Sequence, residues 1–114
     1  MNDRDASHLE DMICYALDAI EMLGSADADA LAGDKMRRYA LVRAVEVVGE
    51  AATRVSAETR ASLPAVPWRS AIGMRNILIH AYASIDLKNL ADTVRNHFPS
   101  LVGVRREVLG ESAP

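Results

Sequence analysis

Apolar residues recur along the chain at the spacing of amphipathic helices, and the first such stripe lies near the N-terminus. Its members are three and four residues apart, which places them on one helix face: Leu9, Met12, Ile13, Ala16, Leu17 and Ile20. Ser7 and Glu10 have the spacing of a capping box near the start of this helix, and Gly24 follows its end. We expect a loop over residues 25–33, which are rich in Asp and Ala.

A second stripe predicts the longest helix, over about residues 34–56. Its apolar face consists of Leu41, Ala44, Val45, Val48, Ala52 and Val55. Pro64 and Pro67 then break the pattern, and Pro67 is well placed as the first residue of a third helix that reaches about His80. Since the third helix is apolar nearly all round, we expect it to lie centrally or in an interface.

Two further helical segments complete the pattern. Asp86 can cap a fourth helix, and Pro99 opens a last helical stretch. Their inward positions are Leu87, Leu90, Ala91 and Val94, then Leu101, Val104 and Val108. The prediction is an all-α, up-and-down bundle of four to five helices. We expect a single domain over residues 1–114, since this length suffices for one core and not two, with a disordered tail over 110–114.

Composition narrows the possible functions. Hydrophobic residues make up 50% of the chain and aromatic residues only 4%, so an aliphatic core is expected, which favours helices over a sandwich or barrel. The net charge of −3 excludes a general basic coat, so any contact with RNA requires a local basic patch. Cys14 has no partner for a disulfide, and no Cys/His spacing resembles a zinc site. With neither a signal peptide nor an apolar run of membrane-spanning length, we expect a cytoplasmic protein without a membrane partner.

The candidate chemistry lies in residues 74–82. This segment places Arg75, Asn76, His80 and Tyr82 in an otherwise apolar helix, where burying polar groups without partners is costly. Asn76 and His80 are four residues apart and share a face, so the amide could fix the imidazole tautomer. Arg75 and His80 are roughly 140° apart on an ideal helix. Arg75 must therefore reach around the helix, or a two-fold homodimer must combine groups from two subunits.

These residue types suit RNA cleavage. A histidine side chain ordinarily titrates near neutrality, so an imidazole at position 80 can take the proton from a ribose 2′-hydroxyl or return one to the leaving oxygen. Arg75 presents a planar fork that binds phosphate and the charge that develops on it. Since no carboxylate cluster on the segment could hold Mg²⁺, we expect metal-free transesterification with no cofactor and no metal site. His8 and His97 show no partner pattern and are expected at the surface.

A structural interpretation of the same residues stays open. Arg75 could be a salt-bridge arginine with Glu46 or Glu50 as its partner, although an acid that orients Arg75 would also serve catalysis. Glu46 and Glu50 lie four residues apart on one helix, which suits general acid–base work, support of the basic site, or simple solvation. Gly49 beside them is expected to allow close helix packing.

The motif Arg75-x4-His80-x-Tyr82 resembles the Arg-x4-His motif of the HEPN superfamily, in the HepT form that ends His-x-Tyr. Two further stretches resemble the same family: VRAVEVVGEA at residues 42–51 and VPWR at residues 66–69. The resemblance covers nearly the whole chain. It implies a dimeric helical bundle with ribonuclease activity, the toxin of a type II or type VII-like toxin–antitoxin pair. It further implies a minimal nucleotidyltransferase antitoxin that adds AMP to the motif tyrosine, which is Tyr82 here.

A different class of function remains as the alternative. The same fold could be a catalytically silent partner module that binds and regulates a nucleotidyltransferase. The intact set of arginine, asparagine, histidine and tyrosine argues against this alternative, because a silent module need not keep it. Transfer RNA and messenger RNA are equally open as substrates.

Overall fold

A computed structural model describes residues 1–80, 84–105 and 107, and all regular structure in these residues is helical. The elements are α1 (Asp3–Leu23), α2 (Ala28–Ala32), α3 (Lys35–Arg54), α4 (Ala57–Ser62), α5 (Trp68–His80), α6 (Leu87–Asp92), the π-helical segment η2 (Thr93–His97) and α7 (Phe98–Gly103). The all-α prediction is therefore confirmed. Tyr82 and the tail 110–114 lie outside the described residues.

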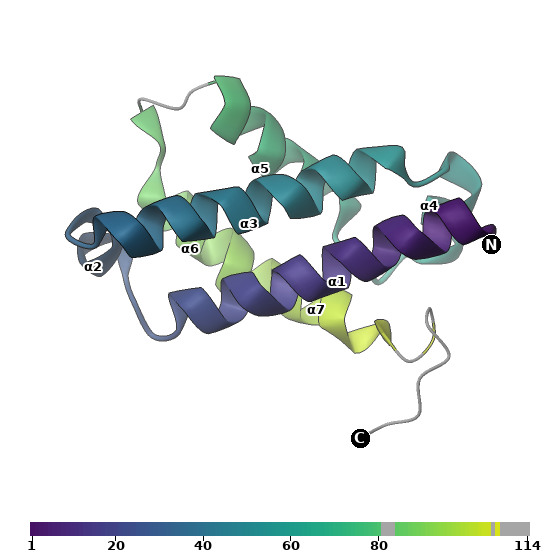
Figure 1. The fold of residues 1–114 in the computed structure, drawn as a ribbon, viewed down its shortest axis with the longest axis horizontal. Coiled ribbons are helices and arrows are strands. Elements are labelled where there is room, and N and C mark those ends of the chain that lie inside the picture. Colours follow the sequence, from purple (N-terminus) through teal and green to yellow (C-terminus); the bar gives the residue numbers. More distant parts are fainter. Residues whose placement is uncertain (81–83, 106, 108–114) are drawn as a thin grey trace.

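The long helices alternate in direction, as in an up-and-down bundle (Figure 1). Helices α1 and α3 lie side by side and run in opposite directions, and α5 packs against α3. The path from α6 through η2 to α7 returns behind them, where η2 and α7 pack against α1. No helix in the described part of the chain is both long and apolar enough to cross a bilayer.

The core forms where the predicted stripes meet. All six predicted positions on α3 are buried, as are the first four on α1, and Phe98 is fully buried among them. On α5, the inward face consists of Ala71, Met74 and Leu78, whereas Ile77 and Ile79 are 42% and 41% exposed. Helix α5 therefore lies at the side of the bundle, with Ile77 and Ile79 uncovered on its two flanks in the single chain.

Local capping explains where the predicted boundaries are wrong. Helix α1 begins at Asp3, ahead of the predicted capping box, because the Asn2 side chain accepts a 2.7 Å hydrogen bond from the Asp5 amide. The predicted loop over residues 25–33 contains α2, which begins where the Asp27 side chain accepts from the Ala30 amide at 2.9 Å. Such a cap satisfies an amide that a helix N-terminus would otherwise leave unpaired.

Pro99 lies in the first turn of the last helical stretch, as predicted, but this stretch is not separated from the preceding helix. Helices α6 and α7 are continuous through η2, with helical backbone at each junction, and the Phe98 amide donates to the Thr93 carbonyl five residues back. Proline lacks an amide hydrogen and clashes with the carbonyl four residues before it in a regular α-helix. The wider π turn just before Pro99 accommodates this residue without ending the helix.

Helix α1 is clamped at both ends by contacts that are long-range in sequence. The buried Asp5 carboxylate accepts from the Ser56 amide at 3.1 Å, from Ser56 Oγ at 2.6 Å and from Thr59 Oγ1 at 2.6 Å. The hydrogen bonds from the Ser56 and Thr59 hydroxyls lower the pKa of Asp5 from 3.8 to about 2. At the other end, Arg95 Nη2 donates to two backbone carbonyls just after α1, at 3.2 and 2.8 Å.

Candidate active site

The site begins with the close approach of α3 and α5. Gly49 on α3 is buried, and a Cβ added there would lie 2.6 Å from the Ala71 carbonyl oxygen and inside the contact distance of Arg75 Cβ. The two backbones approach this closely because glycine has no side chain. The prediction that Gly49 allows close packing is therefore confirmed, and the contact sets the stem of Arg75 against α3.

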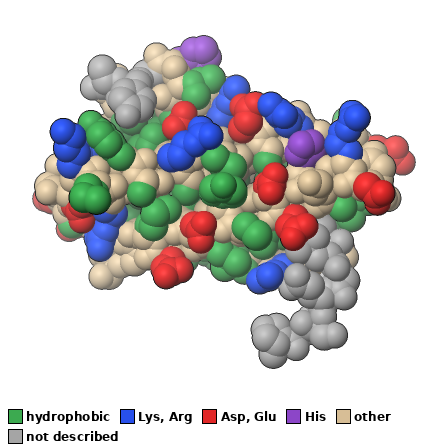
Figure 2. All heavy atoms as spheres, in the orientation of Figure 1, with side chains coloured by type: hydrophobic (Ala, Val, Ile, Leu, Met, Phe, Trp, Pro, Cys, Tyr) green, Lys and Arg blue, Asp and Glu red, His purple; other side chains and the backbone are tan. Residues whose placement is uncertain are grey.

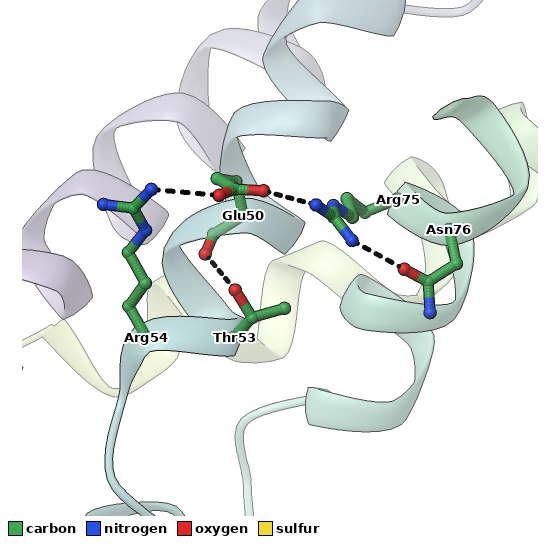
Figure 3. Close-up of polar contacts among 5 residues, drawn as sticks. All are labelled: Glu50, Thr53, Arg54, Arg75 and Asn76. Carbon is green, nitrogen blue, oxygen red and sulfur yellow. Dashed lines mark hydrogen bonds and ion pairs between the residues drawn. The ribbon is translucent and has the colours of Figure 1, made fainter. Parts of the chain in front are cut away.

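Arg75 is held by two neighbours (Figure 3). Its Nη2 donates to Glu50 Oε2 at 2.8 Å, and its Nη1 donates to Asn76 Oδ1 at 2.9 Å. Arg54 Nη2 donates to the other Glu50 oxygen at 3.1 Å, so Glu50 bridges two guanidinium groups. The ion pair predicted between Arg75 and either Glu46 or Glu50 thus forms with Glu50. The Arg75 side chain remains 27% exposed, which leaves its fork open to an external anion.

The electrostatics keep Glu50 ionised. The hydrogen bond from Arg54 lowers the pKa of Glu50 most, Arg75 lowers it further, and burial acts in the opposite direction. An ionised carboxylate holds a guanidinium more firmly than a neutral acid, since charge-assisted hydrogen bonds are the stronger ones. Arg54 was not among the predicted site residues. Its spacing of four residues from Glu50 on one helix is the signal that could have identified it.

Asn76 and His80 do not form the predicted pair. Asn76 is exposed and its side-chain oxygen accepts from the Arg75 guanidinium, a charged donor of the kind that forms the stronger hydrogen bonds. His80 is exposed at the end of α5 and makes no hydrogen bond or ion pair with the residues the structure describes. Its imidazole is therefore free to meet an external group. An orienting effect of Asn76 on His80 stays a prediction.

The structure gives different surroundings to the two remaining candidates, Glu46 and His97. Glu46 is half-buried and forms no ion pair within the described ranges. The prediction that His97 lacks partners is wrong, because its Nδ1 lies 2.9 Å from Ser70 Oγ and its Nε2 lies 3.7 Å from Asp92 Oδ2. Among the residues that the structure places, no group of three or more His, Cys, Asp or Glu side chains could hold a metal ion.

Fold and site together define an all-α protein with a surface arginine fixed by a carboxylate and a free imidazole on the same helix, a combination suited to phosphate binding and proton transfer. A family model described as "Ribonuclease HepT-like" matches residues 12–108. The chain belongs to this HepT-like ribonuclease family, as the resemblance predicted. Family membership and the all-α bundle together agree with the predicted HEPN-like fold.

Relatives support the same assignment. The chain is 38% identical over 102 residues to a Methanocaldococcus jannaschii protein named "Putative RNase MJ1380", covering 89% of this chain and 94% of that protein. It is 40% identical over 70 residues to a Thermococcus cleftensis protein named "Probable ribonuclease HepT", covering 61% of this chain and 64% of that protein. No solved structure matches the chain significantly. The family and the names of its members support a ribonuclease function.

Proposed function

We propose that this protein is a metal-independent endoribonuclease toxin whose active centre is built on α5. The observation that carries the proposal is the state of Arg75: its guanidinium is oriented by Glu50 and Asn76, yet it stays partly exposed on the helix that ends in the free His80. A pre-oriented, partly desolvated arginine stabilises charge that develops on a phosphate better than a freely moving one. Membership of the HepT-like ribonuclease family supports RNA as the substrate.

In the proposed reaction, the ribose 2′-oxygen attacks the adjacent phosphorus and the bond to the 5′-oxygen breaks. The products are a 2′,3′-cyclic phosphate and a 5′-hydroxyl end. His80 acts as the general acid/base: it takes the proton from the 2′-hydroxyl or gives one to the leaving 5′-oxygen. Arg75 binds the non-bridging oxygens and the charge that develops on them. Glu50 and Asn76 are positioning residues, because they act through Arg75.

A homodimer would complete the site. Arg75 and His80 lie five residues apart on α5, about 140° around an ideal helix, so one copy presents them to different sides. The exposed Ile77 and Ile79 lie between them in sequence, on opposite flanks of α5, and each leaves apolar surface that a second copy could cover. We expect light scattering at micromolar concentration to report a dimer, and Ile77→Lys with Ile79→Lys to shift it to a monomer with lower activity. A wild-type monomer at that concentration would exclude the shared site.

The catalytic proposal is tested by RNA digestion. We expect His80→Ala and Arg75→Ala each to reduce cleavage by about 10²–10⁴-fold with unchanged circular dichroism. Arg37→Ala is the matched control, because Arg37 is an exposed arginine near the start of α3.

Activity should persist in EDTA, and strict dependence on Mg²⁺ would exclude the metal-free mechanism. A folded His80→Ala variant that cleaves at the wild-type rate would refute the catalytic role of His80. A wild-type protein that does not cleave RNA would favour the silent regulatory module.

Regulation by a minimal nucleotidyltransferase antitoxin rests on the family resemblance. AMP attached to Tyr82, two residues after His80, would place a second phosphate near Arg75 that competes with RNA for the guanidinium. We expect a cognate nucleotidyltransferase with ATP to add AMP to the wild-type chain, as seen by mass spectrometry, and to abolish cleavage. Tyr82→Phe should keep its activity and escape labelling. Equal labelling of Tyr82→Phe would remove this role from Tyr82.

A further inference from the structure

A groove beside Arg75 is not used by the proposed reaction. It has a volume of about 260 Å³ and lies between α1 and α3, and we call it the α1–α3 groove. Its lining residues are His8 and Asp11 from α1, and Arg43, Val47, Glu50, Ala51 and Arg54 from α3. Because Glu50 both lines the groove and binds Arg75 at 2.8 Å, the groove adjoins the candidate active site.

Arg43 is the available cation of this groove. Its side chain is exposed and makes no ion pair or hydrogen bond with the described residues. The other arginine of the groove, Arg54, is paired with Glu50, and outside the groove Arg38 and Arg95 donate to backbone carbonyls. An exposed guanidinium without a protein partner can bind a phosphate without first breaking an ion pair.

The groove also differs in charge from the whole chain. With His8 counted as neutral, the side chains of the α1–α3 groove and Arg75 carry one net positive charge, whereas the chain carries −3. Figure 2 shows basic and acidic side chains interspersed on the face that carries α1 and α3, so attraction to a polyanion on that face depends on local groups. Local arginines next to the reacting phosphate are therefore the groups expected to hold an RNA strand.

We propose that the α1–α3 groove is a subsite for the RNA strand next to the scissile phosphate, in which Arg43 binds a neighbouring phosphate. Arg43 and Glu50 are seven residues apart on α3, which is about 10 Å along the helix. A strand with one phosphate on Arg75 can therefore pass on to Arg43. Asp11 has the chemistry to accept a hydrogen bond from a ribose 2′-hydroxyl, the group that distinguishes RNA from DNA. This subsite rests on the proposed RNA substrate.

The test measures RNA binding rather than cleavage. In a His80→Ala background, fluorescence anisotropy of a labelled single-stranded RNA gives the binding constant over a range of NaCl concentrations. Loss of one phosphate contact should reduce the slope of log Kobs against log[NaCl] by about 0.7 in magnitude for a single strand. Arg43→Ala should show this smaller slope and weaker binding. Arg37→Ala is the matched control, because Arg37 lines a separate groove at the other end of α1 and α3 and its loss changes the net charge equally.

A second comparison tests Asp11. Asp11→Ala should lower the preference for RNA over DNA of the same sequence, even though loss of its negative charge raises the affinity for both strands. The subsite is wrong if Arg43→Ala and Arg37→Ala give the same slope, or if the His80→Ala parent protein fails to bind the RNA. Cleavage by the wild-type protein with an unchanged Arg43→Ala slope would refute the subsite and leave the proposed reaction intact. Reduced Arg43→Ala binding without wild-type cleavage would retain the subsite and refute the reaction.

Discussion

Gly49→Ala should separate α3 from α5 and destabilise the protein, although alanine is the better helix former. The new Cβ would lie 2.6 Å from the Ala71 carbonyl oxygen and closer still to Arg75 Cβ, whereas ordinary contact begins at 3.4 Å, so the helices must move apart by at least about 0.8 Å. Overpacking of this kind costs about 1–3 kcal/mol. The gain in helix propensity recovers about 0.8–1 kcal/mol. We expect a net loss of up to about 2 kcal/mol from the free energy of unfolding.

Urea denaturation followed by circular dichroism measures this loss. With a typical urea slope of about 1–3 kcal/mol per molar, the midpoint should fall by roughly 0.5–1 M. Gly73→Ala is the matched control, because Gly73 lies within α5 and a Cβ there would meet no atom within 4 Å. It should raise the free energy of unfolding by about 0.5–1 kcal/mol. If Gly49→Ala unfolds at the same or a higher urea concentration than Gly73→Ala, the close contact between α3 and α5 is wrong.

Gly49→Ala should also change the geometry of the active centre. Arg75 Cβ lies against Gly49, so moving α5 displaces the guanidinium from Glu50. The hydrogen bond from Arg75 to Glu50 is 2.8 Å long at present. The same displacement would lengthen it beyond hydrogen-bond range. We therefore expect RNA cleavage by Gly49→Ala to drop under conditions where the variant is fully folded. In Gly73→Ala, the geometry of the active centre should be unchanged. Wild-type activity in folded Gly49→Ala would show that the position of Arg75 is not set by this contact.

Further predictions concern stability in acid, the effect of two arginines on the pKa of Glu50, and the packing of the core. Because the folded pKa of Asp5 is lowered to about 2 from 3.8, its contribution to stability is present above about pH 4 and lost as the pH falls toward 2; Asp5→Asn should flatten that part of the stability–pH curve. In ¹³C NMR titrations, Arg54→Ala and Arg75→Ala should each raise the pKa of Glu50, and an unchanged pKa in either variant would contradict the described pairing. Phe98→Ala should lower the free energy of unfolding by about 3–5 kcal/mol in urea denaturation, and a loss below about 1 kcal/mol would place Phe98 outside the core.

The sequence predicts the long helices well, because a repeated apolar stripe directly reports which face is buried. Helix α2, with five residues, carries no such stripe and depends on the Asp27 cap, so the sequence pattern indicates a loop there. Pro99 predicts the start of the last helical stretch, but the pattern does not reveal the π turn that joins this stretch to α6. Both errors arise where a few local hydrogen bonds decide the backbone path and periodicity carries no information.

The sequence likewise predicts only part of the candidate active site. The spacing of Arg75 and His80 on one helix follows from the sequence, and so does the role of Gly49 in close packing. The partner of Asn76 does not, because two donors, the Arg75 guanidinium and the His80 imidazole, compete for its side-chain oxygen, and the outcome depends on where α3 holds the guanidinium. The position of the guanidinium depends on how α5 packs against α3. The residue pattern of a single helix carries no information about that packing.

The clamps at both ends of α1 have a consequence for hydrogen exchange. Helix ends normally fray, so their amides exchange with solvent before those of the middle turns. In α1, opening the first turn requires breaking the hydrogen bonds between Asp5 and residues 51 and 54 positions further along the chain. Opening the last turn disturbs the bonds from Arg95, which lies 69 to 71 positions away. The terminal amides of α1 should therefore exchange together with the contacts that join distant parts of the chain, so that α1 opens as one cooperative unit rather than from its tips.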